Sequence, residues 1–420
     1  MSLTTSVETF AFASGFHASA VACGLKTSSA MGASSLDLSL VSADHNCSAA
    51  AVFTTNKVKA APVLYDQQII AGHAGAIRAI ITNSGCANAC TGPQGMQNTQ
   101  RTAELVAKQI GCLPSQILVM STGVIGRQLD MAKLEQGIVS VASEQAQHGA
   151  PVVARAIMTT DTKPKTAHTT IQVDGKAVTI AGCCKGAGMI HPNMATMLAI
   201  ITTDANIAPS LLDAELRAAV SHSFNRISVD GDTSTNDTVL LLASGTAGVT
   251  IDATQSASHT SFTNALTEVC TSLAKQVARD GEGATRLVEI SVTGARDVAE
   301  AHIVANSIAR SPLVKTAIHG GDPNWGRVLC AAGYSGADID QTKLSLTFGP
   351  ADRPGDNDTP HVRVVAGGLP LQYEERQAAA TLKADPVLIH LDLGQGGAAT
   401  TVWTCDMSAE YVEINAHYTT

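Results

Sequence analysis

The sequence contains few charged residues and no concentrated basic segment. Asp, Glu, Lys and Arg make up 15% of its 420 residues, against roughly 25% in an average soluble protein. The net charge is -9 at pH 7, and the densest basic grouping is the loose TKPK of residues 162–165. Proteins that bind nucleic acid or an anionic membrane usually present a basic face to it. We therefore expect neither of these partners.

Long hydrophobic runs are also missing. No stretch approaches the roughly 18 consecutive apolar residues of a membrane span. The start, MSLTTSVETFAF, lacks the positively charged region of a signal peptide. Ten cysteines are scattered through the chain, without the two ligand pairs of a zinc site. These features predict a cytoplasmic protein with free thiols and no bound metal.

The secondary-structure signals that are present mix strands with helices, which predicts an α+β or α/β class in which helices cover the sheets. The segment FGPADRPGDNDTP, residues 348–360, is typical of a surface loop between two strands. The expected strands are residues 77–85, 116–123, 177–182, 197–205, 238–245, 287–294, 343–349, 361–368 and 387–394. The expected helices are residues 102–111, 210–225, 261–283 and 297–311.

The stretch KGAGMIHPNMATMLAIITTDA passes from a glycine-rich loop into an apolar run at Thr196. The simple interpretation is a loop that enters a buried strand. The chemical one is that the chain cleaves itself there, so that Thr196 becomes an N-terminal nucleophile whose own amine, with a pKa of about 7.7–8.0 in peptides, acts as the base. The small Ala195 leaves room for the attack, which allows self-cleavage but does not indicate it. Without further observations, a loop that enters a buried strand is the better interpretation.

A second requirement of such chemistry is an oxyanion hole, meaning donors aimed at the developing negative charge. The segment STGVIGRQ, residues 121–128, follows an apolar strand and turns on two glycines. Thr122 can offer a hydroxyl there and Gly123 a backbone N–H. A simple strand-to-loop turn explains the same pattern, and without further observations it is the better interpretation.

Several motifs nevertheless occur together in this chain: VMSTGVIG, MTTDTKPK, KGAGMIHPNMATML, DGEGATR, DPNWGR and YVEINAHYTT. Over essentially the whole chain they resemble the ArgJ family, the ornithine acetyltransferases or glutamate N-acetyltransferases. The resemblance implies an αββα-type layered α+β fold like that of the N-terminal-nucleophile hydrolases. It also implies self-cleavage between Ala195 and Thr196, into an alpha chain of residues 1–195 and a beta chain of residues 196–420.

The resemblance also implies roles for individual residues. Thr196 matches the family's cleavage threonine and catalytic nucleophile, and Thr122 and Gly123 match its oxyanion hole. The one visible departure is Cys86, where asparagine is expected in many relatives, and it lies outside the implied site. The implied substrate-binding residues are Thr159, Lys185, Thr196, Glu282, Asn415 and Thr420.

The activity that the resemblance implies is acetyl transfer from N2-acetylornithine to glutamate through an acetyl-threonine intermediate, without a cofactor or metal. Acetyl-CoA is a further candidate donor, which the sequence leaves open. Charge complementarity suggests that Lys185 faces a substrate carboxylate and Glu282 a substrate ammonium. The family also implies a heterotetramer of two alpha and two beta chains.

Other interpretations stay open at this point. A self-processed threonine aminopeptidase or amidase would use the same nucleophile but let water resolve the acyl-enzyme, and a non-enzymatic binding protein would keep its chain intact. His191 and the DPNWGR loop, residues 322–327, can be structural or part of the site. Cys183 and Cys184, beside Lys185, are expected to be packed thiols rather than activated ones. The carboxylate-rich residues 225–237 are expected to form capped turns near the site rather than bind a cation.

Overall fold

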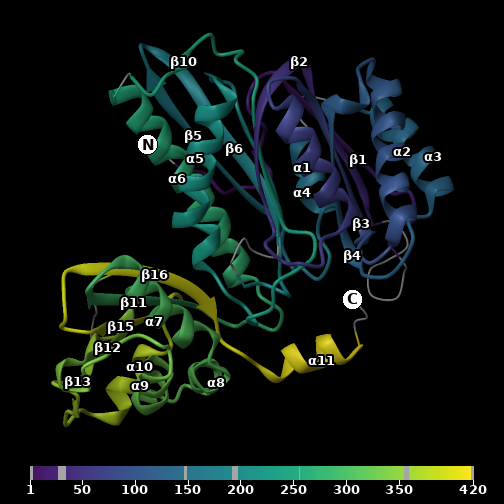
Figure 1. Ribbon diagram of the computed structural model, residues 1–420. Coiled ribbons are helices and arrows are strands. Elements are labelled where there is room, and N and C mark those ends of the chain that lie inside the picture. Colours follow the sequence, from purple (N-terminus) through teal and green to yellow (C-terminus); the bar gives the residue numbers. More distant parts are fainter. Residues whose placement is uncertain are drawn as a thin grey trace. The chain divides into compact units, whose positions relative to one another are not determined.

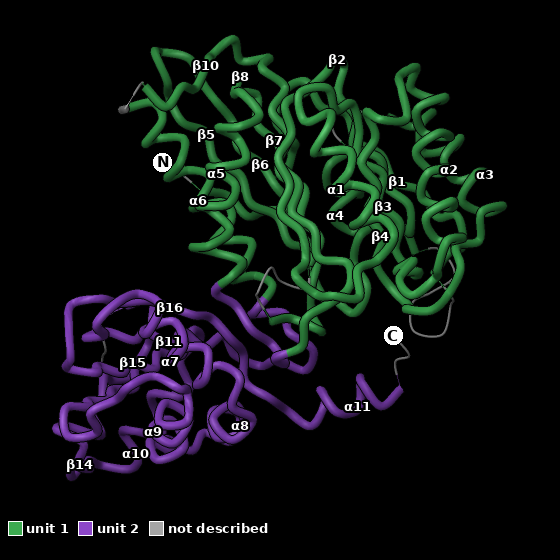
Figure 2. The backbone as a smooth tube through the Cα atoms, in the orientation of Figure 1, with its two compact units in different colours: residues 1–225, 232–277, 420 green, residues 226–231, 278–419 purple. Residues whose placement is uncertain are grey.

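The computed structural model describes residues 3–26, 35–145, 149–191, 197–254, 256–353 and 359–417. They form two compact units (Figures 1 and 2). Unit 1 comprises residues 1–225, 232–277 and 420, and unit 2 comprises residues 226–231 and 278–419. Both units combine helices with a sheet, which confirms the mixed α+β class. A compact unit is not a cleavage fragment, so the predicted division into an alpha and a beta chain remains a prediction.

The strands of unit 1 are mostly buried and apolar, and several of them are rich in the β-branched residues that favour extended backbone. They are β1 (Phe16–Val21), β2 (Leu38–Phe53), β3 (Ile77–Cys86), β4 (Ile117–Val124), β5 (Lys165–Val173), β6 (Lys176–Lys185), β7 (Leu198–Thr203), β8 (Asn206–Ile207), β9 (Thr238–Ala243) and β10 (Thr250–Ile251).

These strands form one large mixed sheet and one small one. The large sheet follows the order β4-β3-β2-β9-β7-β6-β5, with β1 paired to β2, and β8 pairs with β10. Strand β2 changes partners along its length: its residues 38–42 pair with both β1 and β3, and its residues 48–53 pair with β9. The ladder with β3 shifts register between Ser42 and Cys47, where residues 44–46 are exposed. One long strand therefore connects the two halves of the sheet.

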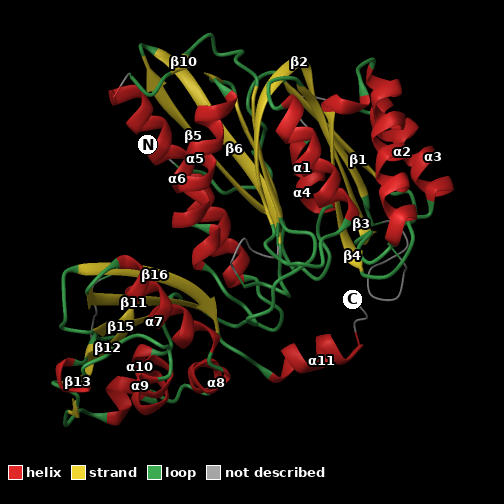
Figure 3. Cartoon of the chain, viewed as in Figure 1, coloured by secondary structure: helices red, strands yellow, loops and turns green. Residues whose placement is uncertain are grey.

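Helices flank both halves of this sheet (Figure 3). Helix α6 packs on β5 and β6, and α5 packs on β2. Helices α2 and α3 lie on the opposite side of the unit, beyond β3 and β4. The Cys184 thiol of β6 faces α6, with its Sγ 3.8 Å from the carbonyl oxygen of Leu273. The helices of unit 1 are α1 (Ala61–His73), α2 (Gly92–Ile110), α3 (Met131–Ser143), α4 (Ala150–Ala156), α5 (Pro209–His222) and α6 (Ser256–Arg279), with short 3₁₀ turns η1 (Pro114–Gln116) and η2 (Phe224–Arg226).

One apolar core joins the two halves of the large sheet to α2, α3 and α4. Ile80 and Leu118 belong to it from β3 and β4, and Leu198 and Leu240 from β7 and β9. Each of these side chains is at most 1% exposed. Polar groups at the strand ends beside this core are consequently shielded from water, which strengthens the electrostatic interactions among them.

Unit 2 contains a second mixed sheet in the order β14-β13-β12-β15-β11-β16. Helix α7 packs on β11 and β16, and α10 packs on β12 and β13. The elements are β11 (Leu287–Ala295), β12 (Ser345–Pro350), β13 (Val362–Ala366), β14 (Leu369–Pro370), β15 (Val387–Asp392), β16 (Ala398–Cys405), α7 (Val298–Arg310), α8 (Pro312–His319), α9 (Trp325–Gly333), α10 (Glu375–Thr381), α11 (Ala409–His417) and the 3₁₀ turn η3 (Gln341–Lys343).

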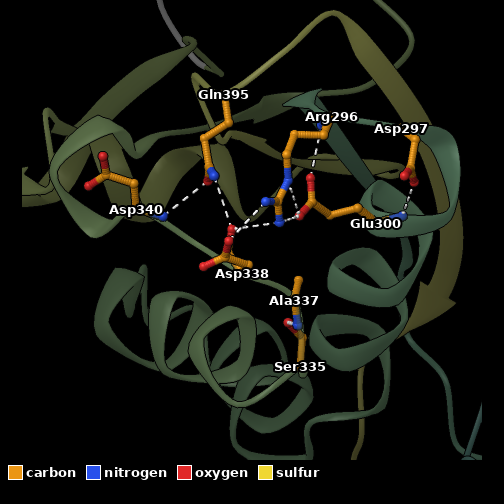
Figure 4. Close-up of polar contacts among 8 residues, drawn as sticks. All are labelled: Arg296, Asp297, Glu300, Ser335, Ala337, Asp338, Asp340 and Gln395. Atoms are coloured by element: carbon orange, nitrogen blue, oxygen red, sulfur yellow. Dashed lines mark hydrogen bonds and ion pairs between the residues drawn. The ribbon is translucent and has the colours of Figure 1, made fainter.

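A polar network fastens the loops at the N-terminal end of α7 (Figure 4). The Arg296 guanidinium donates to the Glu300 carboxylate at 2.5 Å and to Asp338 Oδ2 at 2.8 Å. Gln395 donates to the Asp338 carbonyl and accepts the Asp340 N–H, each at 3.0 Å. Three loops that are distant in sequence are thereby joined, and the network has a structural role.

Most of the predicted elements are confirmed. The predicted strands correspond to β3, β4, β6, β7, β9, β11, β12, β13 and β15, and the predicted helices to α2, α5, α6 and α7. The predicted loop joins β12 to β13, although its residues 354–358 lie outside the described ranges. Strands β1, β2, β5, β8, β10, β14 and β16 and the remaining helices were not predicted. Among the residues that the structure describes, every helix is too short or too polar to span a bilayer.

Candidate active site

The end of β4 carries the two predicted oxyanion-hole residues. Four buried apolar residues, Ile117–Met120, hold the strand in the core, and its last residues are more polar and less deeply buried. Gly123 has φ +129°, and a Cβ atom there would lie 2.3 Å from the carbonyl carbon of Gly85. Only glycine fits this close approach of two strands. The predicted turn follows the strand at residues 125–126, and glycine is required at position 123 within the strand end itself.

Lys185 reaches this strand end from the other half of the sheet. It is the last residue of β6 and is 6% exposed. Its Nζ donates to Thr122 Oγ1 at 3.4 Å. In the ladder between β6 and β7, Lys185 lies directly opposite Leu198. The lysine thus lies between the strand end that carries Thr122 and the first residues of β7.

Asp161 forms hydrogen bonds with Thr159 and Lys165 and interacts electrostatically with Lys185. Its Oδ1 accepts from Lys165 Nζ at 2.6 Å and from the Gly186 N–H at 2.7 Å, and its Oδ2 accepts the Thr159 N–H at 3.0 Å. Burial alone would raise the pKa of Asp161, but the charges of Lys165 and Lys185 more than offset this and hold the pKa well below its usual value. The structure therefore brings Thr159, Lys185 and Thr122 together around a buried ion pair.

A second buried carboxyl group lies close to Lys185. Asp237 immediately precedes β9 and is 3% exposed. Burial raises its pKa well above the usual range, although the charge of Lys185 and the N–H of Met197 act in the opposite direction. Among the described residues, its Oδ2 has no hydrogen-bond partner. Capped turns were expected in this segment, with no role for Asp237; the one sequence signal for it was its position in a carboxylate-rich segment.

The cysteines near the site behave as packed thiols. Burial raises the pKa of both Cys183 and Cys184, which supports the packing interpretation over activation by the adjacent lysine. Cys86 is nearer to the candidate site than its place in the sequence suggested. It forms a bulge that pairs with both Thr122 and Val124, and its Sγ lies 3.4 Å from the Arg127 carbonyl oxygen. Cys86 is not among the implied site residues, but it borders the Thr122 backbone.

Unit 2 holds the other two described candidates side by side. Asn415 Nδ2 donates to Glu282 Oε2 at 2.8 Å and to the Tyr411 carbonyl at 2.9 Å. The loop that carries Glu282 is fixed by Asp406, which accepts the N–H groups of Thr285 at 2.7 Å and of the next residue at 2.9 Å. These candidates belong to unit 2, whereas Thr122, Gly123, Thr159 and Lys185 belong to unit 1.

Three candidates lie outside the described residues: Ala195 and Thr196 at the predicted cleavage site, and Thr420 at the C-terminus. Within the described ranges, no group of three His, Cys, Asp or Glu side chains could hold a metal ion. His191 contributes its carbonyl oxygen to a hydrogen bond from Thr233 Oγ1 at 3.1 Å. The DPNWGR segment begins α9, where the Asn324 side chain accepts the Arg327 N–H as an N-cap.

Clustered, buried ionisable groups with shifted pKa values are typical of active sites, so the fold and this site indicate a mixed α+β enzyme. The family model described as the ArgJ family matches residues 17–420. The arginine biosynthesis bifunctional protein ArgJ, mitochondrial, of Heterostelium pallidum is 44% identical, over 100% of this chain and 97% of that protein. The arginine biosynthesis bifunctional protein ArgJ of Thermotoga neapolitana is 46% identical, over 91% of this chain and 95% of that protein.

Among solved structures, the ornithine acetyltransferase of Mycobacterium tuberculosis, complexed with ornithine, is 38% identical. The match covers 46% of this chain and 99% of that chain, with a TM-score of 0.41. The chain belongs to the ArgJ family. It is accordingly an acyltransferase of arginine biosynthesis.

Proposed function

We propose that the chain transfers the acetyl group of N2-acetylornithine to glutamate, through a covalent acetyl ester on Thr196. The observation that carries this proposal is the contact of Lys185 with Thr122 at 3.4 Å, where the ends of β6 and β4 meet. Leu198 lies opposite Lys185 in the ladder, and Thr196 is only two residues before Leu198 in the chain. The hydroxyl donor and a cation thus meet in unit 1, and we place the proposed nucleophile beside them by its position in the chain.

The proposal includes a maturation step. Thr196 Oγ attacks the carbonyl carbon of Ala195, the C–N bond breaks, and the freed nitrogen takes up the hydroxyl proton. Water then hydrolyses the resulting ester, leaving an alpha chain of residues 1–195 and a beta chain that begins at Thr196. The freed α-amine supplies the base that a threonine hydroxyl needs near neutral pH. The mature fold is then a self-cleaved, αββα-layered relative of the N-terminal-nucleophile hydrolases.

In the first half-reaction, Thr196 Oγ attacks the acetyl carbonyl while the Thr196 amine takes the hydroxyl proton. The Thr122 hydroxyl and the Gly123 N–H stabilise the tetrahedral oxyanion. The C–N bond breaks, the amine returns the proton to the leaving nitrogen, and ornithine departs. In the second half-reaction, the glutamate amine attacks the ester, N-acetylglutamate leaves, and Thr196 Oγ regains its proton.

Substrate recognition is proposed to follow charge. Lys185 binds a substrate carboxylate, and Thr159, whose N–H donates to Asp161 Oδ2, is a further substrate contact. Glu282, held by Asn415, binds a substrate ammonium, and Thr420 contributes from the C-terminus. No metal or redox cofactor takes part in these steps. The functional assembly is proposed to contain two alpha and two beta chains.

The relatives carry the word bifunctional in their names. We extend this to the present chain and propose that acetyl-CoA is a second acetyl donor, which gives N-acetylglutamate without acetylornithine. The relatives from Heterostelium pallidum and Dictyostelium discoideum are named as mitochondrial. The cytoplasmic location of this chain stays a prediction.

The maturation step is tested by intact mass and N-terminal sequencing of the purified protein beside Thr196→Ala. The expected result is two fragments in the wild type, the second beginning Thr-Met-Leu-Ala, and one intact chain in the variant. A single intact wild-type chain that nevertheless transfers acetyl groups would contradict an N-terminal nucleophile.

The acceptor is tested by following ornithine release from N2-acetylornithine with and without glutamate. Release that depends on glutamate and yields N-acetylglutamate in equal amount supports the transferase. Equal release in its absence, with free acetate as the product, would instead indicate the amidase alternative. Replacing acetylornithine by acetyl-CoA in the same assay tests the second donor.

A further inference from the structure

Asn236, which the sequence analysis did not single out, fastens the strand end that carries Thr122 and Gly123. It precedes β9 by two residues and is 6% exposed. Its Nδ2 donates to the Ala87 carbonyl at 2.6 Å and to the Ser121 carbonyl at 2.8 Å. Ser121 lies on β4, and Ala87 directly follows β3. One buried amide group therefore holds two neighbouring strands at the place where both end.

The orientation of this amide follows from its partners. Both strand atoms are carbonyl oxygens, which only accept hydrogen bonds, so the NH₂ group must face them. The opposite atom, Asn236 Oδ1, accepts the Thr235 hydroxyl at 2.6 Å. The backbone on each side is also held, since the Thr235 carbonyl accepts the Ala60 N–H and the Asp237 carbonyl accepts the Thr54 N–H, each at 2.9 Å. Both the NH₂ group and the Oδ1 atom of Asn236 thus have hydrogen-bond partners, and the flanking backbone is bonded to other residues of unit 1.

One of the two carbonyls directly precedes Thr122, and the other belongs to the residue whose N–H pairs with Val124, just after Gly123. The Ser121 carbonyl shares a planar peptide unit with the Thr122 N–H, so a hydrogen bond to this oxygen fixes the plane from which Thr122 projects. On the other strand, the Ala87 N–H donates to the Val124 carbonyl at 3.0 Å. The regular ladder is interrupted between these points by the bulge at Cys86. The Asn236 NH₂ group donates to the Ala87 and Ser121 carbonyls next to this interruption of the ladder.

We propose that Asn236 is a positioning residue for acyl transfer, because its amide fixes the Ser121–Thr122 peptide unit, directly before the one that carries the Gly123 N–H. The proposal rests on the proposed function, in which these two residues stabilise the oxyanion. Such donors act only if they are held at the place where charge develops. Asn236 touches neither substrate nor the reacting atoms in this scheme. Its loss should lower the rate of the chemical step more than it weakens substrate binding.

The test compares Asn236→Leu with Asn98→Leu. Asn98 is also 6% exposed in unit 1, but its amide contacts the side chains of Gln94 and Gln128 instead of strand carbonyls. We would measure the fraction of cleaved chain, the unfolding transition, and kcat and KM for N2-acetylornithine with glutamate, expressed per cleaved chain. The expected result is a loss of kcat of about 100-fold for Asn236→Leu, with KM changed by less than about threefold and Asn98→Leu near wild type.

A folded Asn236→Leu that stays uncleaved, while Asn98→Leu is cleaved, also supports the proposal, because both acyl steps use the same threonine. A kcat within about twofold of wild type would overturn it, as would an equal loss in Asn98→Leu or a rise in KM alone. Where Asn236→Leu does not fold, Asn236→Ser keeps one hydroxyl donor, and an intermediate kcat is expected. Failure of both variants to fold would assign Asn236 a structural role only. Absence of transfer in the wild type would count against the proposed function instead.

Discussion

Lys185 Nζ lies 3.4 Å from Thr122 Oγ1, although 63 residues separate them in the sequence. In this contact the threonine oxygen accepts a hydrogen bond from the ammonium group. A hydroxyl that accepts through its oxygen keeps its own hydrogen free to donate elsewhere. Lys185 therefore leaves Thr122 able to donate to an oxyanion and adds a positive charge beside it.

The first prediction concerns the charge of Lys185. Lys185→Met keeps most of the side-chain volume but removes the ammonium group, and we expect kcat/KM for acetyl transfer to fall by about 100-fold or more. The control is Lys176→Met, at the exposed start of the same strand, where Nζ donates to the Gly248 carbonyl. Steady-state kinetics on folded protein checks this. Similar kcat/KM values for the two variants would refute a special role of Lys185.

The second prediction separates steric fit from backbone conformation at two glycines of one segment. Gly123 has φ +129°, and its Cβ would lie 2.3 Å from the carbonyl carbon of Gly85. Gly126 has φ +81°, and its Cβ would have no neighbour within 4 Å. We expect Gly126→Ala to cost about 1 kcal/mol in the free energy of unfolding and to keep its activity. Gly123→Ala should cost about 3 kcal/mol and lose most acetyl transfer. Urea unfolding and steady-state kinetics of both variants test this. Equal losses of stability and activity in Gly123→Ala and Gly126→Ala would contradict a steric requirement at Gly123.

The third prediction is the acid sensitivity conferred by Asp161. Its pKa is lower in the folded protein than its ordinary value of 3.8, so the carboxylate stabilises the fold above about pH 4. This contribution is lost as the pH falls below that value. Asp161→Asn leaves Lys165 buried without its counter-charge, and we expect about 3 kcal/mol lower stability at neutral pH, with a smaller difference in acid.

The control for this variant is Asp213→Asn, which removes a surface ion pair with Arg217. That change should cost less than about 1 kcal/mol. The measurement is urea unfolding at several pH values between neutral and strongly acid. A stability difference between wild type and Asp161→Asn that does not change with pH would refute the assignment.

The fourth prediction has the opposite sign and concerns Asp66 of α1. Its Oδ1 accepts the Val119 N–H at 2.9 Å, and burial raises its pKa well above the usual range. A carboxyl group of this kind takes up a proton on folding, so stability falls as the pH rises from about 4 toward the raised pKa. Asp66→Asn keeps the acceptor but cannot ionise. Its stability relative to wild type should therefore improve as the pH rises, and parallel stability curves from pH 5 to about pH 8 would contradict this.

The sequence predicted those elements whose pattern is local. Residues 77–85 and 261–283 have continuous apolar runs or clear helical periodicity, and both formed the expected elements. Strand β2 was not predicted because polar residues interrupt the apolar ones in its sequence, LSLVSADHNCSAAAVF. The reason is visible in the structure, since residues 44–46 leave the core where the strand changes partners.

The site was predictable only in part. The motifs identified Thr122 and Lys185 as candidates, but their contact depends on how the two halves of the sheet meet. Asn236 could not be recognised, because its partner Ser121 is 115 residues away and an isolated asparagine carries no motif. Asp161 was present in a quoted motif, yet its link to Thr159 and the lysines follows from a tight turn that the sequence does not specify.

The strand order of unit 1 determines how a cleaved chain would hold together. Strands β9 and β7, from residues 196–420, lie between β2 and β6, from residues 1–195. A cut at Ala195 would therefore yield two polypeptides that share one hydrogen-bonded sheet, each completing the other. They would separate under denaturing electrophoresis but migrate as one species under native conditions, and neither would have an intact sheet by itself.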